Sequence, residues 1–253
     1  LLVHDNSVTN IRTLILDNNF HSAMDLNNHE RIVYEYTKYF HLGILFAENS
    51  QDVLFIGGGG FSAPKRFLVN YPEMSIDVIE IDKDVVIAGE KFFFVPEDER
   101  LKIINDDGRT FLRTTDKKYD MIVLDAYDRS YIPFHLMTKE FHQLVSEHLT
   151  EDGILVSNII TSISGDSAIL FLSELKTMES VYPNIYIYPV VSSQENVIQN
   201  IIVVAHKQDI SVTKLELLSR QNNIDVDLSQ AIENEYEGII QLESYKILND
   251  NFA

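Results

Sequence analysis

Three acidic side chains and a glycine run are the features of this sequence most suited to chemistry. Glu80, Asp107 and Asp125 each stand at or just after the end of an apolar run, and Gly57-Gly58-Gly59-Gly60 follows an earlier one. A glycine loop lets a ligand approach the backbone, and an acidic residue about twenty positions further on accepts hydrogen bonds from both ribose hydroxyls. The spacing predicts a nucleoside site, with Glu80 on the ribose and Asp107 on the adenine amino group.

The glycine run does not complete the dinucleotide fingerprint. Gly57 and Gly59 fit its first two positions, but Ser62 occupies the third. No lysine follows in a Walker pattern, so the ligand is expected to lack a polyphosphate. Ser62 is expected to cap the helix that follows, with Pro64 in its first turn. The competing interpretation of the glycines is that they only make a tight strand-to-helix turn.

Neighbouring acidic residues leave two assignments open. Asp82 follows Glu80 by two residues, but it is better placed to cap a helix that begins at Lys83. In Asp106-Asp107-Gly108 one aspartate is a candidate helix cap, while Gly108 permits close approach of the base. Glu80 is therefore preferred for the ribose, and the cap and adenine roles are shared by the two adjacent aspartates.

A pair of carboxylates, Asp125 and Asp128, is the predicted catalytic centre. Asp125 ends an apolar strand at the edge where open α/β sheets bind ligands. Two carboxylates there can hold a cationic amine and take its proton, so that the neutral nitrogen attacks a carbon bonded to a sulfonium. The alternative for Asp128 is a loop cap.

Composition excludes several other functions. The chain has no cysteine, which rules out a disulfide framework and a thiolate metal site and fits a reducing cytosol. Its eight histidines lack metal-ligand spacing; His135 and His142 are interpreted as surface residues, and no metal is expected. The net charge of −19 disfavours nucleic acid and anionic lipid, and neither a spanning segment nor a secretory signal is predicted. The same charge attracts cations such as polyamines.

Alternating strands and helices from residue 53 onward predict an α/β fold with a parallel sheet. Apolar runs predict strands at 53–56, 76–81, 101–104, 121–124 and 154–158, and a late pair at 185–188 and 201–205. Helices are expected at 64–70, 83–92, 109–112, 139–148 and 168–181, and short ones at 215–218 and 239–242. Before these elements we expect a hairpin around 11–20 and an amphipathic helix over 31–46, with Tyr34 and Tyr36 as core residues. We divide the chain into a small N-terminal β domain with the start of the linking helix, residues 1–42, and a Rossmann-like nucleoside-binding domain, residues 43–253.

As a set, these motifs resemble the spermidine synthase family. The resemblance spans residues 11–205 and rests on four segments, namely Val53–Gly59, Val78–Asp82, Asn105–Gly108 and Tyr119–Asp125. The stretches at 125–127 and 132–138, with His21–Leu26, are similar to the spermidine synthase-like branch, which is often fused to membrane segments.

The resemblance implies a small N-terminal β domain and a methyltransferase-type sheet. It implies transfer of an aminopropyl group from decarboxylated S-adenosylmethionine to a putrescine-like amine, with release of methylthioadenosine and no prosthetic group. By motif position, Glu80 binds the ribose, Asp107 and Gly108 bind the adenine, and Pro133 lies near the nucleoside. The other nucleoside-binding residues are Gly57, Gly58 and Gly59. Asp125 is the proton acceptor, assisted by Asp128. Such proteins usually form homodimers through the N-terminal region.

Three departures alter the expected amine pocket. The family's aspartate after the three glycines is Gly60 here, and a histidine expected after Tyr34 is Glu35. The loop after Pro189 reads Val190-Val191-Ser192-Ser193-Gln194-Glu195, without the usual tyrosine. Aminopropyl transfer is the leading hypothesis. Methyl transfer from S-adenosylmethionine and a non-catalytic nucleoside-binding module are the alternatives.

Overall fold

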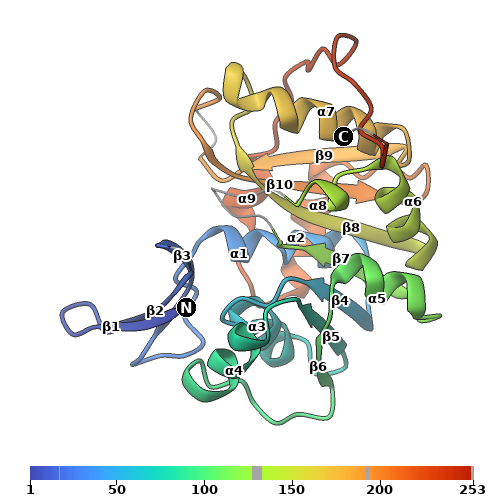
Figure 1. The fold of residues 1–253 in the computed structure, drawn as a ribbon. Helices are drawn as coiled ribbons and strands as arrows, with labels where there is room; N and C mark the ends of the chain where they lie inside the picture. The colour runs from blue at the N-terminus through green and yellow to red at the C-terminus, as the bar shows by residue number, and fades with distance from the viewer. Residues whose placement is uncertain (17, 127–132, 192–193, 252–253) are drawn as a thin grey trace.

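A computed structural model describes residues 1–16, 18–126, 133–191 and 194–251. At the N-terminus a three-stranded antiparallel sheet is formed by β1 (Leu2–Asn6), β2 (Ile11–Leu16) and β3 (Asn19–Asp25). It lies to one side of the main sheet (Figure 1). The predicted hairpin is present as β2 and β3, and β1 adds a third strand that its polar sequence did not suggest.

The main sheet has seven strands in the order β6-β5-β4-β7-β8-β10-β9. They are β4 (Asp52–Ile56), β5 (Ser75–Glu80), β6 (Leu101–Asn105), β7 (Tyr119–Leu124), β8 (Leu149–Thr161), β9 (Asn184–Pro189) and β10 (Gln199–His206). Pairing is parallel from β6 to β8, whereas β10 is antiparallel to both β8 and β9. The chain leaves β4 toward β5 on one side and reaches β7 on the other. This reversal of strand order is where α/β sheets bind ligands.

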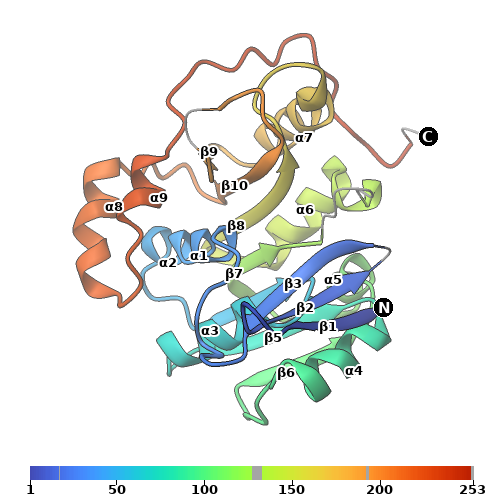
Figure 2. The same cartoon turned by 90° about the vertical axis from the view of Figure 1, so that its left-hand side faces the viewer.

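The central strands are buried on both faces, which explains their unbroken apolar sequences. In β4 and β7, residues 53–56 and 121–124 are at most 2% exposed. One face packs against α1 (Tyr36–Tyr39), α2 (Leu42–Phe46), α3 (Ser62–Asn70), α8 (Lys214–Arg220) and α9 (Ser229–Glu233). The other packs against α5 (Gly108–Thr114), α6 (Lys139–His148) and α7 (Ile169–Glu179) (Figure 2). The remaining helix, α4 (Lys83–Phe92), packs Val85 and Ala88 against the N-terminal sheet.

Two capped helices, α4 and α6, have the bounds that the sequence predicts, whereas α5 and α8 are longer than predicted at both ends. Asp82 caps α4 by accepting a hydrogen bond from the Asp84 N–H at 2.8 Å, and Thr138 caps α6. The expected Ser62 cap is wrong, because Phe61 holds the N-cap position of α3 at φ 56°. The Ser62 hydroxyl instead donates to the Ala23 carbonyl on β3, at 3.3 Å.

Other differences have tertiary causes. The single helix expected over residues 31–46 is two short helices, and α2 packs so closely on the sheet that a Cβ at Gly43 would lie 2.3 Å from the Met121 sulfur. Residues 239–242 form no helix, whereas α9 forms where none was expected. None of the helices in the described ranges has the length and apolar character needed to span a bilayer.

Candidate functional site

The glycine loop connects β4 to α3 at the reversal point of the sheet. Gly57 and Gly59 adopt φ values of +101° and +49°, which residues with side chains rarely adopt. The Gly57 N–H donates to the Ile79 carbonyl at 2.8 Å, and a Cβ there would lie 2.2 Å from the Asp125 carbonyl oxygen. The loop is therefore confined between the ends of β5 and β7, and the turn itself requires glycine.

Glu80, at the end of β5, is fixed by the backbone around it. One carboxylate oxygen accepts from the Gly58 and Gly59 N–H groups at 2.9 and 3.1 Å, and the other accepts from the Asp82 N–H at 2.9 Å. The residue is 8% exposed. A carboxylate has about four acceptor directions, so these bonds leave capacity for a hydroxyl donor. Glu80 is thus a buried, oriented acceptor beside the glycine loop.

Asp107 takes the helix-cap role that the sequence left open between it and Asp106. Its Oδ1 caps α5 by accepting from the Thr110 N–H at 2.8 Å, and its Oδ2 lies 3.1 Å from His135 Nε2. Burial raises the pKa of Asp107, but the bonds from Thr110 and His135 outweigh it and hold that pKa below its usual value. Gly108 serves packing, because a Cβ there would lie 2.4 Å from Ile56 Cγ2.

A cavity of about 410 Å³ brings the predicted residues together. Its lining contains Gly57, Gly59, Glu80, Asp107, Gly108, Asp125 and Pro133. Gly58 contributes through its N–H to Glu80 instead. Asp128 lies outside the described residues. Apart from Gly58 and Asp128, the residues predicted for the site therefore line one cavity.

A second cavity, of about 600 Å³, adjoins the first at two shared residues. Tyr36 and His21 line both cavities, and Asn158 lines the second. Asp125 joins them: its Oδ1 accepts from Asn158 Nδ2 at 2.8 Å, and its Oδ2 accepts from the Tyr36 hydroxyl at 3.4 Å. Asn158 is oriented in turn by Asn200, whose Nδ2 donates to Asn158 Oδ1 at 2.9 Å. The aspartate thus lines the first cavity and is hydrogen-bonded to two residues that line the second.

Burial shifts the pKa values of Asp125 and Tyr36. It raises the pKa of Asp125 to about 6, against the opposing effect of the bonds from Asn158 and Tyr36. Burial, with the nearby Asp125 charge, also raises the pKa of Tyr36 well above its usual value. At neutral pH Asp125 is an ionised carboxylate of higher basicity than an exposed aspartate, and Tyr36 is a neutral donor.

The departures from the family pattern have definite positions. Gly60 is buried against the N-terminal sheet, where a Cβ would lie 2.4 Å from Ser22 Oγ, and it lines neither cavity. Glu35 lines the second cavity with a 63% exposed side chain, 3.5 Å from Lys38 Nζ. The position of the missing aspartate is therefore closed to a side chain, and Glu35 offers a carboxylate at a different place.

The surface interpretation is wrong for His142 but not for His135, whose side chain is 43% exposed. His142 is fully buried and not on the surface, and its burial lowers its pKa to about 3. His135 lines the first cavity and contacts Asp107. Within the described ranges, no group of three or more histidine, aspartate or glutamate residues could hold a metal ion.

Sequence reasoning missed Tyr36, Asn158 and His21 as site residues. Tyr36 had been interpreted as core, because aromatic residues at helical spacing usually are. Asn158 ends the strand predicted at 154–158, although β8 itself continues to Thr161, and its polar side chain after an apolar run was an available signal. His21 lies on β3 and reaches the cavities because the N-terminal sheet packs beside them. The local sequence does not indicate that packing.

Comparisons with known proteins agree with this arrangement. The family model described as "Spermine/spermidine synthase domain" matches residues 34–214. A polyamine aminopropyltransferase of Vibrio vulnificus is 31% identical over 170 residues, which is 66% of this chain and 55% of that protein. The chain spans about half, or less, of the length of the curated relatives that it matches.

Solved structures show the same fold at low identity. A probable spermidine synthase from Corynebacterium glutamicum superposes with a TM-score of 0.79 at 18% identity, over 99% of this chain and 93% of that one. Human methyltransferase-like protein 13, in complex with SAH, gives 0.63 at 21% identity, over 83% and 97%. The Rossmann-like sheet, the glycine loop followed by Glu80 and the extent of the family match lead to one assignment: the chain belongs to the spermine/spermidine synthase family.

Proposed function

We propose that this protein transfers the aminopropyl group of decarboxylated S-adenosylmethionine to an amine and releases methylthioadenosine. The observation that carries the proposal is that Asp125 lines the cavity of Glu80 and Asp107 and is hydrogen-bonded to Tyr36 and Asn158, which line a second cavity. In this proposal Glu80 accepts the ribose hydroxyls, Asp107 accepts the adenine amino group, and the amine enters from the second cavity.

The reaction needs one proton acceptor. The neutral amine nitrogen forms a bond to the aminopropyl carbon while the carbon–sulfur bond breaks, and its electron pair neutralises the sulfonium. The proton released from nitrogen passes to Asp125, a general base. An ammonium with a pKa near 10 holds its proton more tightly than a carboxylate with a pKa of about 6, so orientation of the amine must contribute.

The second cavity favours an amine with a polar far end. Its lining includes Asn18, Asn19, Asn158 and Asn200, whose amide oxygens can accept from an ammonium. Among the described lining residues Glu35 is the carboxylate, and it can balance one further positive charge. We therefore propose a diamine of putrescine type as the acceptor, with one nitrogen at Asp125 and the other toward the amides and Glu35.

The test is incubation of the purified chain with decarboxylated S-adenosylmethionine and a panel of monoamines, diamines and triamines. Chromatography would follow methylthioadenosine, and mass spectrometry would identify an acceptor heavier by one aminopropyl group. If none of the amines in the panel caused release of methylthioadenosine, the proposal would be contradicted. S-adenosylhomocysteine formed from S-adenosylmethionine would favour methyl transfer. Methylthioadenosine binding without turnover, unchanged in Asp125→Asn, would favour a non-catalytic module.

We also propose a homodimer formed through the N-terminal region, in a cytoplasmic setting without a nucleic-acid partner. Support for the dimer comes from exposed apolar side chains on the N-terminal sheet and its loops, namely Leu1, Leu2, Val8 and Phe20. Light scattering would test it, and a monomeric mass across the concentration range would contradict it.

A further inference from the structure

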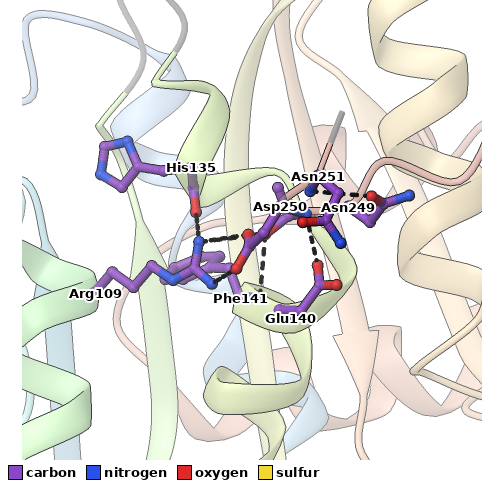
Figure 3. A network of polar contacts seen from close by, with 8 residues as sticks. Arg109, His135, Glu140, Phe141, Asn249, Asp250 and Asn251 are labelled. Carbon is purple, nitrogen blue, oxygen red and sulfur yellow. Dashed lines mark hydrogen bonds and ion pairs between the residues drawn. The ribbon is translucent and has the colours of Figure 1, made fainter. Parts of the chain in front are cut away.

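Arg109 is a buried cation next to the proposed nucleoside cavity. It stands in the first turn of α5, two residues after Asp107, and is 7% exposed. Its two terminal nitrogens donate to the two carboxylate oxygens of Asp250, at 2.8 and 2.5 Å (Figure 3). A bidentate pair of this kind fixes both partners in orientation as well as in distance. The charge of Arg109 is therefore balanced by a residue 141 positions further along the chain.

The segment that carries Asp250 is bound along the start of α6. The Leu248 carbonyl accepts from the Lys139 N–H at 2.9 Å, and the Asp250 N–H donates to Glu140 Oε2 at 3.1 Å. The Thr138 hydroxyl, at the N-cap of α6, donates to Asp250 Oδ1 at 2.8 Å. A negative charge is favourable at this end of a ten-residue helix. We name residues 248–251 the C-terminal strap.

The strap is also held by its contacts with α7 and the apolar cluster. Leu248 is 4% exposed within the same apolar cluster as α6 and α7, and its N–H donates to Thr177 Oγ1 at 2.8 Å. The strap thus connects α5, α6 and α7 through a few specific bonds.

One bond links the strap to the cavity. The same Arg109 nitrogen that binds Asp250 also donates to the His135 carbonyl, at 2.9 Å. His135 belongs to the 3-10 turn Phe134–Leu136 that follows Pro133, and its ring contacts Asp107 Oδ2 inside the cavity. Figure 3 shows the guanidinium between the His135 carbonyl and Asp250. The position of His135 and Pro133 relative to Asp107 therefore depends on an arginine that Asp250 holds in place.

We propose that Arg109 and Asp250 are positioning residues for the nucleoside site, through which the C-terminal strap sets the affinity for the adenosine part of the donor. Neither side chain lines the cavity, so both act through His135 and Asp107. The inference rests on the proposed function only in taking a nucleoside as the ligand. It adds to that function a dependence on a segment outside the nucleoside motifs.

Asp250→Asn tests the inference, because it keeps the shape of the side chain and removes the charge that balances Arg109. The affinity for methylthioadenosine, measured by calorimetry well below the melting temperature, is expected to fall roughly tenfold, the scale of one lost charged hydrogen bond. The KM for decarboxylated S-adenosylmethionine should rise similarly, with kcat nearly unchanged. Asp250→Glu, which keeps the charge, should recover most of the affinity.

Asp98→Asn is the matched control. Asp98 makes a bidentate pair with Arg100, at 3.1 and 2.6 Å, and neither residue lines the nucleoside cavity. This variant should bind methylthioadenosine like the parent chain. If Asp250→Asn also binds like the parent, even with a lower melting temperature, the strap is only structural and the inference is overturned. If the parent chain itself binds no methylthioadenosine, the proposed function fails as well, so the two failures are distinguishable.

Discussion

At the scale of single residues, the surroundings of Asp125 determine its proposed role more than its residue type does. Asp107 is also an aspartate at a strand end, but its carboxylate is engaged with Thr110 and His135 and its pKa is lowered. Asp125 has a raised pKa and contacts Tyr36 and Asn158, each of which lines the second cavity. One aspartate is therefore suited to accept a hydrogen bond and the other to accept a proton.

Asp125→Asn should separate chemistry from binding. An amide cannot take the proton of the amine, so kcat is expected to fall by about 10²- to 10⁴-fold, the usual contribution of a general base. Methylthioadenosine affinity should persist, since Glu80 and Asp107 remain. Asp116→Asn, at an exposed loop position before β7 that lines neither cavity, is the control. A variant at Asp125 with parental turnover would remove this residue from the mechanism.

The pH dependence should report the same group. Because Asp125 must be ionised to accept a proton and its pKa is about 6, kcat/KM should fall steeply below pH 6. The bond from Asn158 favours the ionised form, so Asn158→Ala should raise that pKa and move the acid limb to higher pH. Profiles from pH 5 to 9 would be compared. The titration of the amine affects the parent chain and the Asn158→Ala variant equally. Superimposable acid limbs would therefore contradict the assignment of the limb to Asp125.

Residues at strand ends could be predicted from the sequence, whereas their partners from other elements could not. Glu80, Asp107 and Asp125 each follow an apolar run, and parallel strands bring such ends to one edge. Tyr36 reaches Asp125 from a helix 89 positions away, and Arg109 reaches Asp250 over 141 positions. These contacts depend on how separate elements dock, and no local pattern encodes that docking.

At the scale of elements, the helices α4 and α6 were predicted to the residue, whereas α5 and α8 were predicted too short at both ends. The bounds of α4 and α6 match because Asp82 and Thr138 cap them through their own first turns. The start of α3 was predicted wrongly because β3 takes the Ser62 hydroxyl. A helix start that depends on a tertiary contact, as in α3, cannot be located from local sequence signals alone.

The contact between β3 and the glycine loop gives a prediction for Gly60. Restoring the aspartate typical of the family, Gly60→Asp, should destabilise the protein and not improve amine binding, because its Cβ would meet Ser22 Oγ at 2.4 Å and Phe93 at 3.0 Å. A buried, unpaired carboxylate adds to the cost, for a total of about 2–4 kcal/mol. Urea denaturation would measure the loss.

A double-mutant cycle isolates the steric part of that effect. Gly60→Ala should destabilise less than the aspartate, and combining it with Ser22→Gly should recover part of the loss, since the clashing side chain is gone. Gly60→Asp with parental stability and higher amine affinity would show that this position opens to the acceptor.

At the scale of the whole molecule, the sheet order decides where the two cavities meet. The reversal between β4 and β7 brings the glycine loop and Asp125 together, and the Asp125 N–H donates to the Ile56 carbonyl at 2.9 Å. On the far side β8 supplies Asn158 and β10 supplies Asn200, which orients it. Besides pairing with β8 and β9, the antiparallel strand β10 therefore supports the orientation of Asp125.

The net charge of −19 leads to a prediction about the rate of amine capture. Glu35 is the carboxylate among the described lining residues of the second cavity, so a cationic acceptor is attracted mainly by the field of the whole protein. Added salt screens that field over a distance of about 10 Å at 0.1 M and about 3 Å at 1 M. With the sulfonium donor saturating, kcat/KM for a diamine should fall by roughly tenfold between low salt and about 0.5 M salt. A monoamine, with half the charge, should lose less, and kcat should change little for either. Equal salt dependence for the two amines would mean that the acidic surface does not steer the acceptor.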